Sequence, residues 1–148
     1  MPPESRAGEH GRERELTNLL DLRMPGDSCA VAAVSDAIAE TLSRLHIPEE
    51  KRLEIGLAVQ EALANAVVHG CKNDPSKEVC CRLDRDAEGR IMIVVTDPGR
   101  GFRSNALSDP NDPENLHADH GRGVYLIRQL MDEVHFEKGG NQIRMWKY

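Results

Sequence analysis

The chain has 148 residues with a formal net charge of −6 and 30% charged residues, the size of one domain that buries about two thirds of its unfolded surface. The negative charge argues against a nucleic-acid backbone as a partner, and 3% aromatic residues are too few for a platform that stacks single-stranded bases. No apolar run has transmembrane length and the polar N-terminus lacks a signal-peptide core, so we expect a cytoplasmic protein without a membrane segment.

The sequence divides into a short tail and one domain. Residues 1–14 are rich in proline, glycine and charge and predict a flexible tail. This leaves residues 15–148 as one domain. Residues 15–24 predict its first strand, which ends at the turn formed by Pro25 and Gly26.

A helix is predicted after this turn, capped by Asp27 or Ser28 and running to about Leu45. A second helix then opens at Pro48, because proline and the acidic residues after it suit a first turn. The apolar residues of the first helix fall on one stripe: Ala30, Val34, Ala37, Ile38, Leu42 and Leu45.

The stretch 53–70 is apolar or small at nearly every position and predicts a buried central helix. It contains a carboxylate, Glu61, and four residues later an amide, Asn65, which a helix stacks on one face. Because a buried charge needs a partner or a metal, this pair indicates the wall of a cleft. An ordinary solvated stripe is the other interpretation, and the helix by itself leaves both open.

The second half of the chain predicts strands, a long loop and one more helix. Two β-rich runs, 78–83 and 90–96, form a hairpin, and the second is β-branched and continuous, as expected of an inner strand. Residues 103–119 have few apolar positions and predict a loop that is functional or mobile. A helix at 121–136 and a closing strand at 141–148 complete an α+β two-layer sandwich, with helices on one face of a mostly antiparallel sheet.

The four cysteines show no metal-binding spacing. We expect them to be reduced thiols with structural roles. The last two are adjacent, so a strand points them to opposite faces. They are Cys29, Cys71, Cys80 and Cys81.

Two glycine pairs flank the predicted loop. Asp97 ends the inner strand and is followed by Gly99 and Gly101, which let a backbone approach a ligand closely. Gly121 and Gly123 open the last helix, whose N-terminus can offer N–H groups to a phosphate. Either pair alone fits a plain turn equally well, but nothing in folding requires the order of Glu/Asn helix, Asp-x-Gly-x-Gly, loop and Gly-x-Gly.

Three segments, VQEALANAVVHG, TDPGRGF and GRGVYLIRQLMDEV, resemble the N, G1 and G2 boxes of the ATPase superfamily of gyrase, heat-shock chaperones, histidine kinases and mismatch-repair proteins. More narrowly, they are similar to bacterial anti-sigma factor serine kinases of the RsbW type, over roughly residues 22–147. The resemblance implies the Bergerat ATP-binding fold, in which the nucleotide lies between the helical layer and a lid at about 103–120.

The resemblance also implies a role for each matching position. Asn65 would bind Mg²⁺ through a neutral oxygen, Glu61 would be the general base for a serine hydroxyl of a partner, and Asp97 would accept a hydrogen bond from the adenine amino group. The other box residues would contact the nucleotide: Gly99, Gly101, Phe102, Gly121, Arg122 and Gly123.

One position departs from the family pattern. Where family members often carry Gly-Thr before the last strand, this chain has Gly140-Asn141. Asn141 can also form hydrogen bonds, so we expect weaker or altered nucleotide contacts there. A plain turn residue is the alternative interpretation of Asn141.

The implied function combines an enzyme and a regulator. As a homodimer that uses ATP and Mg²⁺, the chain would sequester a sigma factor and phosphorylate a serine on a STAS-type anti-sigma factor antagonist, without contacting nucleic acid or membrane. A non-catalytic partner-binding module of the same fold is the alternative. A detached histidine-kinase ATPase domain is less expected, because no histidine-bearing helical segment precedes the domain in this sequence.

Overall fold

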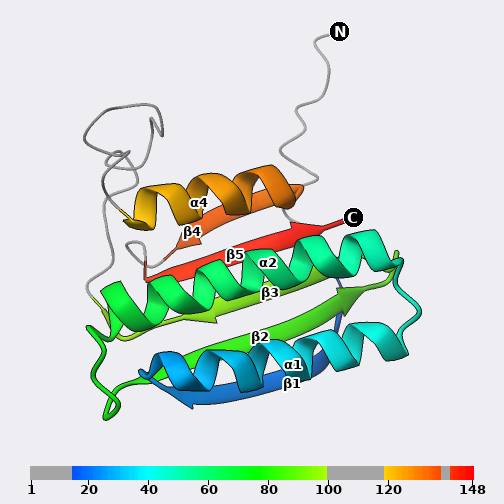
Figure 1. The fold of residues 1–148 in the computed structure, drawn as a ribbon. Coiled ribbons are helices and arrows are strands. Elements are labelled where there is room, and N and C mark those ends of the chain that lie inside the picture. Colours follow the sequence, from blue (N-terminus) through cyan, green and yellow to red (C-terminus); the bar gives the residue numbers. More distant parts are fainter. Residues whose placement is uncertain (1–14, 100–118, 138–140) are drawn as a thin grey trace, which may run out of the picture.

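The computed structural model describes residues 15–99, 119–137 and 141–148. It shows a layer of helices covering one face of a five-stranded sheet (Figure 1). The strand order is β1-β2-β3-β5-β4, and every neighbouring pair is antiparallel. The predicted α+β two-layer sandwich is therefore confirmed, while the predicted tail and nearly all of the predicted lid lie outside the described residues.

The elements alternate between the two layers along the chain. The strands of the sheet are β1 (Leu16–Pro25), β2 (Glu78–Asp86), β3 (Ile91–Thr96), β4 (Glu133–Glu137) and β5 (Gln142–Lys147). The helical layer consists of α1 (Ser28–Arg44), α2 (Glu49–Asn65), the π-helical turn η2 (Ala66–Gly70) that continues α2, and α4 (Asp119–Leu130).

Helix α1 forms as its sequence predicts. The Asp27 side chain caps it by accepting a hydrogen bond of 2.9 Å from the backbone N–H of Cys29, which satisfies one of the free N–H groups of the first turn. Val34, Ile38 and Leu42 recur at four-residue spacing and are buried against the sheet. The predicted cap and stripe are both confirmed.

Strand β3 is the inner strand that its continuous apolar run predicts. It lies between β2 and β5, so both of its edges are hydrogen-bonded, and its residues are buried on both faces of the sheet. Ile91, Ile93 and Val95 belong to the main core, whereas Met92 and Val94 form a second small cluster with Trp146. An apolar residue at every position is what burial on both faces requires.

The helix predicted at 121–136 is wrong in its second half. Helix α4 ends at Leu130, and β4 begins at Glu133. Val134 and Phe136 alternate with polar residues and pair with β5, so the ladder with a neighbouring strand overrides the helical pattern. Strand β5 therefore lies inside the sheet and does not close its edge.

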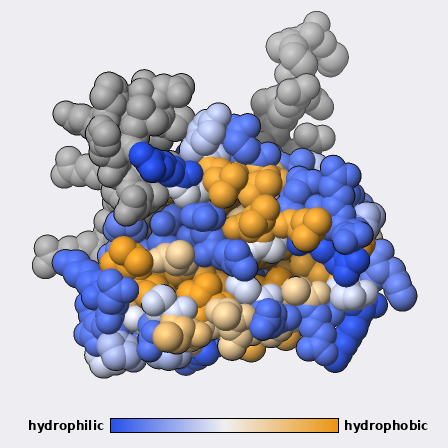
Figure 2. Space-filling model, viewed as in Figure 1, coloured by the Kyte–Doolittle hydropathy of each residue, from blue (hydrophilic) through white to orange (hydrophobic). Residues whose placement is uncertain are grey.

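The central helix is buried on one side only, which corrects the expectation of a helix buried all round. Leu53, Leu57 and Val68 are 62%, 49% and 44% exposed, and Figure 2 shows apolar side chains gathered on this face of the helical layer. Although these side chains are exposed, none of the helices in the described ranges is long and apolar enough to cross a bilayer.

The cysteines follow the predicted pattern. All four are free thiols, and Cys81 is buried in the core while its neighbour Cys80 is half-buried on the other side of β2. Burial raises the pKa of Cys81 to about 12. A thiol with so high a pKa stays protonated and unreactive, as expected of a structural cysteine.

Candidate functional site

Glu61 and Asn65 lie together on the side of α2 that faces α4. A Cβ atom added to Gly123 of α4 would lie 3.0 Å from both Glu61 Oε2 and Asn65 Nδ2. Both side chains are half-buried and reach the same point, so the predicted stacking on one helical face is confirmed. Because Gly123 has no side chain, α4 can pack this closely against α2.

Helix α4 begins earlier than the sequence predicts. It starts at Asp119, so Gly121 and Gly123 lie inside its first turns, and Arg122 between them is exposed. Helix geometry leaves the N–H groups of a first turn without intrahelical acceptors, and this end therefore favours an anion. For Gly123, however, the close contact in the structure is with Glu61 and Asn65.

Asp97 follows β3, and one of its two carboxylate oxygens accepts a hydrogen bond. Its Oδ1 atom accepts a 2.7 Å hydrogen bond from the N–H of Gly99, and no donor among the described residues contacts Oδ2. Burial raises the pKa of Asp97, and the hydrogen bond from Gly99 opposes that rise. A half-buried acceptor is thus available to a ligand with an N–H group.

Two glycines bring backbone against this carboxyl group. A Cβ atom on Gly70 would lie only 2.2 Å from Asp97 Cγ, and one on Gly99 would lie 2.7 Å from Asp97 Oδ1. The π-helical turn positions Gly70, since the N–H of Cys71 donates to the carbonyl of Ala66, five residues back, at 2.8 Å. The end of η2 is therefore in direct contact with the residue that follows β3.

Asn141 holds the backbone of Asp97 from the position just before the neighbouring strand β5. Its carbonyl accepts from the Asp97 N–H at 2.9 Å, and its Nδ2 donates to the Asp97 carbonyl at 3.2 Å. Its Oδ1 is buried without a hydrogen-bond partner in the described part of the chain. Asn141 thus holds the backbone beside the Asp97 carboxyl group, while its contact with a nucleotide stays a prediction.

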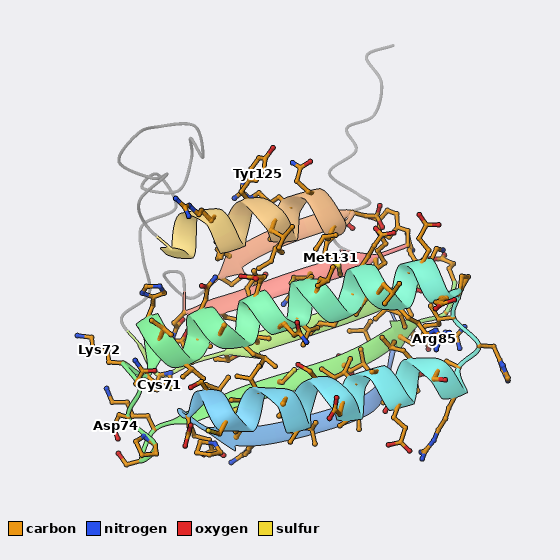
Figure 3. All side chains as sticks on the ribbon, viewed as in Figure 1. Cys71, Lys72, Asp74, Arg85, Tyr125 and Met131 are labelled. Atoms are coloured by element: carbon orange, nitrogen blue, oxygen red, sulfur yellow. The ribbon has the colours of Figure 1, made fainter. Side chains whose placement is uncertain are left out.

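The loop after η2 lies at the same end of the molecule, where Figure 3 shows Cys71, Lys72 and Asp74 together. Lys72 and Asn73 both have positive φ, 52° and 58°, and the Asn73 N–H returns to the carbonyl of Val67 at 3.0 Å. Burial raises the pKa of the Cys71 thiol, and the negative charge of Asp97 raises it further. The thiol is therefore neutral and part of the packing behind Asp97.

The structure arranges the predicted residues in two groups along α2 and η2. Glu61, Asn65 and Gly123 form one, and Asp97, Gly99 and Asn141 form the other, with Gly70 as a member that sequence reasoning missed. The only sequence signal for Gly70 is a glycine at the end of an apolar helix. Gly101 and Phe102 lie outside the described residues.

No cluster of metal-ligating side chains marks this site. Within residues 15–99, 119–137 and 141–148 no group of three or more His, Cys, Asp or Glu gathers to hold a metal. Mg²⁺ bound with phosphates needs only one or two protein oxygens, because water and the phosphates supply the others. The amide oxygen of Asn65 beside Glu61 fits that requirement.

Comparison with known proteins gives one family. The sequence model of the family described as "Histidine kinase-like ATPase domain" matches residues 24–147. The serine-protein kinase RsbW of Staphylococcus epidermidis is 30% identical over 136 residues, which cover 87% of this chain and 86% of that protein. RsbW of Bacillus subtilis (strain 168) is 27% identical, with 87% and 84% covered.

Two solved structures share the fold. One contains the RsbU and RsbW domains of Rv1364c from Mycobacterium tuberculosis (TM-score 0.57, 19% identity), and the similarity covers 87% of this chain but 32% of that longer one. The other is the histidine kinase domain of the blue-light activated histidine kinase EL346 from Erythrobacter litoralis (TM-score 0.55, 22% identity), with 95% and 66% covered.

Proposed function

Because this chain belongs to the histidine kinase-like ATPase domain family, and within it to the serine-protein kinases of the RsbW type, we propose that it is an ATP-dependent serine kinase and anti-sigma factor. The observation that carries the proposal is the pair Glu61 and Asn65, which both contact the position of Gly123 on α4. This contact supports the proposal, because a carboxylate that would act as the base and an amide that would hold the metal then lie beside the N-terminal turns of a helix, where an anion is favoured.

The second group of residues fits the adenine base. Asp97 has an oxygen without a donor among the described residues, and the glycines beside it leave its carboxyl group flanked by bare backbone. We propose that this oxygen accepts a hydrogen bond from the adenine amino group. Asn65 would hold Mg²⁺, which would neutralise negative charge on the phosphates of ATP.

In the proposed reaction Glu61 receives the proton of a serine hydroxyl as the serine oxygen attacks. Bound ATP supplies the phosphoryl group, so a bond forms between the serine oxygen and the γ-phosphorus while the bond to the β-phosphate oxygen breaks. Phosphoryl transfer depends mainly on positioning and electrostatics. The side chains at Glu61 and Asn65 and the first turn of α4 supply both.

The proposed partners come from the family relationship. The chain would sequester a sigma factor and phosphorylate a serine of a STAS-type antagonist. The unmodified antagonist would release the sigma factor from the chain. Both partners act where transcription takes place, so the proposal places the chain in the cytoplasm. We also propose a homodimer, as the resemblance implies.

The Glu61→Gln variant tests the proposed base. We expect it to bind ATP within about twofold of wild type, because the pocket keeps its shape, and to transfer phosphate to the antagonist about 10²- to 10⁴-fold more slowly, the usual contribution of general acid–base catalysis. The matched control is Glu50→Gln, the same change at an exposed acidic residue in the first turn of α2.

Transfer of labelled phosphate from ATP to purified STAS-type antagonists measures this difference. Transfer by Glu61→Gln at the wild-type rate would contradict the assigned role. If the wild type binds ATP and the sigma factor without transferring phosphate, the chain is the non-catalytic binding module.

A further inference from the structure

A cavity of about 220 Å³ lies at the end of the domain remote from Asp97 and Asn65. Its walls come from the α1–α2 turn, the start of α2, the β2–β3 hairpin and the end of β5. Ile55 and Ile91, which belong to the main core, line its apolar part. Figure 3 shows Arg85 at this end and Cys71 and Lys72 at the opposite one.

Arg85 is the inward-facing residue at the end of β2. Val79, Cys81 and Leu83, which precede it at two-residue spacing, all belong to the core beneath the helices, so strand alternation turns Arg85 to the same side. Its guanidinium lies over the hairpin glycine, since a Cβ atom on Gly89 would be 3.3 Å from an Arg85 terminal nitrogen.

No carboxylate neutralises this arginine within the described ranges. None of the described acidic residues forms an ion pair with Arg85 or with Lys51, which lines the cavity from the first turns of α2. Lys51 is exposed and needs no partner, but Arg85 is half-buried, and a charge withdrawn from water normally has one. An inward-facing arginine with no ion pair among the described residues therefore calls for an anion at this cavity.

The other charged groups of the cavity are already paired. Lys147 Nζ donates to Glu54 Oε2 at 2.6 Å and to the Leu130 carbonyl at 2.7 Å, and Glu88 forms an ion pair with Arg90. Lys147 and Glu54 cancel each other, whereas Arg90 is shared between Glu88 and Asp86. Arg85 and Lys51 are therefore the lining cations that have no ion pair among the described residues.

The positive end of α2, which begins here at Pro48, already has the acidic Glu49 and Glu50 in its first turn and adds nothing for a ligand. Two other features favour an anion at this point. His46, in the left-handed conformation with φ 58°, adds an imidazole donor from the α1–α2 turn. The guanidinium fork of an arginine matches the geometry of phosphate oxygens.

We propose that this cavity is a second ligand site, separate from the nucleotide site, for a small phosphate monoester whose remaining part is apolar and planar. Arg85 and Lys51 bind the phosphate. Ile55, Ile91 and the ring of Tyr148, which also line the cavity, receive the planar part. The proposal does not depend on the kinase function.

Phenyl phosphate and inorganic phosphate are suitable probes, measured by calorimetric titration of the full chain. We expect phenyl phosphate to bind more tightly than inorganic phosphate, because only the ester covers the apolar wall. Arg85→Gln and Lys51→Gln should each weaken binding by about tenfold or more, since each removes a charge-assisted hydrogen bond. The control Arg23→Gln, at an exposed ion pair on β1, should bind like wild type.

The Asn65→Ala variant separates this site from the nucleotide site, where phosphate could also bind. We expect Asn65→Ala to bind phenyl phosphate like wild type. Binding lost in Asn65→Ala but kept in Arg85→Gln would place the phosphate at the nucleotide site and overturn the proposal. Absence of binding at millimolar probe, or equal binding by all variants, would overturn it as well. Lys51 is exposed, so its variant gives an answer even if Arg85→Gln fails to fold.

Discussion

Replacing Gly70 by alanine adds one methyl group at the contact between η2 and Asp97. The new Cβ would lie 2.2 Å from Asp97 Cγ and 2.4 Å from Oδ1, whereas ordinary contacts begin at 3.4 Å. The difference means that the carboxyl group has to move by about 1 Å. The Asp97 backbone cannot follow freely, because Asn141 holds both its N–H and its carbonyl.

The size of the effect follows from this displacement. Overpacking of this kind destabilises a protein by about 1–3 kcal/mol. A hydrogen bond to a charged group contributes about 1.5–3 kcal/mol, and 1.4 kcal/mol corresponds to a factor of ten in affinity. A carboxylate moved out of place should therefore weaken ATP binding by roughly 10- to 150-fold.

The same substitution in α2 provides a matched control. A Cβ atom on Gly56 would meet nothing within 4 Å, and glycine inside a helix is less stable than alanine by about 0.5–1 kcal/mol. For a domain of this size Gly56→Ala should therefore raise the melting temperature by about 1–4 °C. ATP affinity should stay at the wild-type value.

Calorimetry with ATP and Mg²⁺, combined with thermal unfolding of the wild type and both variants, tests this pair of expectations. We expect Gly70→Ala to lose affinity and melt lower, and Gly56→Ala to keep affinity and melt higher. If Gly70→Ala binds ATP within twofold of wild type, the contact between Gly70 and Asp97 does not position the adenine acceptor, and the reasoning is refuted.

Three further changes test other parts of the site. Burial raises the pKa of Asp97 above its ordinary 3.8, so the charged carboxylate destabilises the fold at pH values above the raised pKa. This destabilisation disappears as the pH falls below 3.8. Asp97→Asn should therefore melt higher than wild type at pH 7, a gain that shrinks in acid, while losing ATP affinity; a lower melting temperature at pH 7 would contradict this. Asn65→Ala should bind ATP equally with and without Mg²⁺ in calorimetry, and an unchanged metal dependence would exclude Asn65 as the ligand. Gly123→Ala places a Cβ 3.0 Å from flexible ends of Glu61 and Asn65, so its melting temperature should stay near wild type while phosphotransfer falls about tenfold through misplacement. Transfer at the wild-type rate would mean that this contact does not matter.

Local patterns in the sequence predict most of the fold. The stripe of Val34, Ile38 and Leu42 and the cap at Asp27 define α1, because helix periodicity and capping act within a few residues. The continuous apolar run of β3 likewise predicts burial on both faces. Glu61 and Asn65 could be placed on one face for the same reason.

Features that depend on distant contacts were not predictable in this way. Strand β4 exists because Val134 and Phe136 pair with β5, and a pattern read locally continues α4 through them. Gly70 matters because η2 meets Asp97, a contact set by the packing of α2 on the sheet. The fit of Gly123 against Glu61 likewise depends on how α4 lies beside α2.

Calorimetric titration of the purified chain with ATP, with and without Mg²⁺, tests the central claim most directly. The proposed site predicts saturable binding of one ATP per chain that requires Mg²⁺ and is lost in Asp97→Ala. Absence of binding at millimolar ATP, or binding that Asp97→Ala leaves unchanged, would contradict a nucleotide site formed by Asn65 and Asp97.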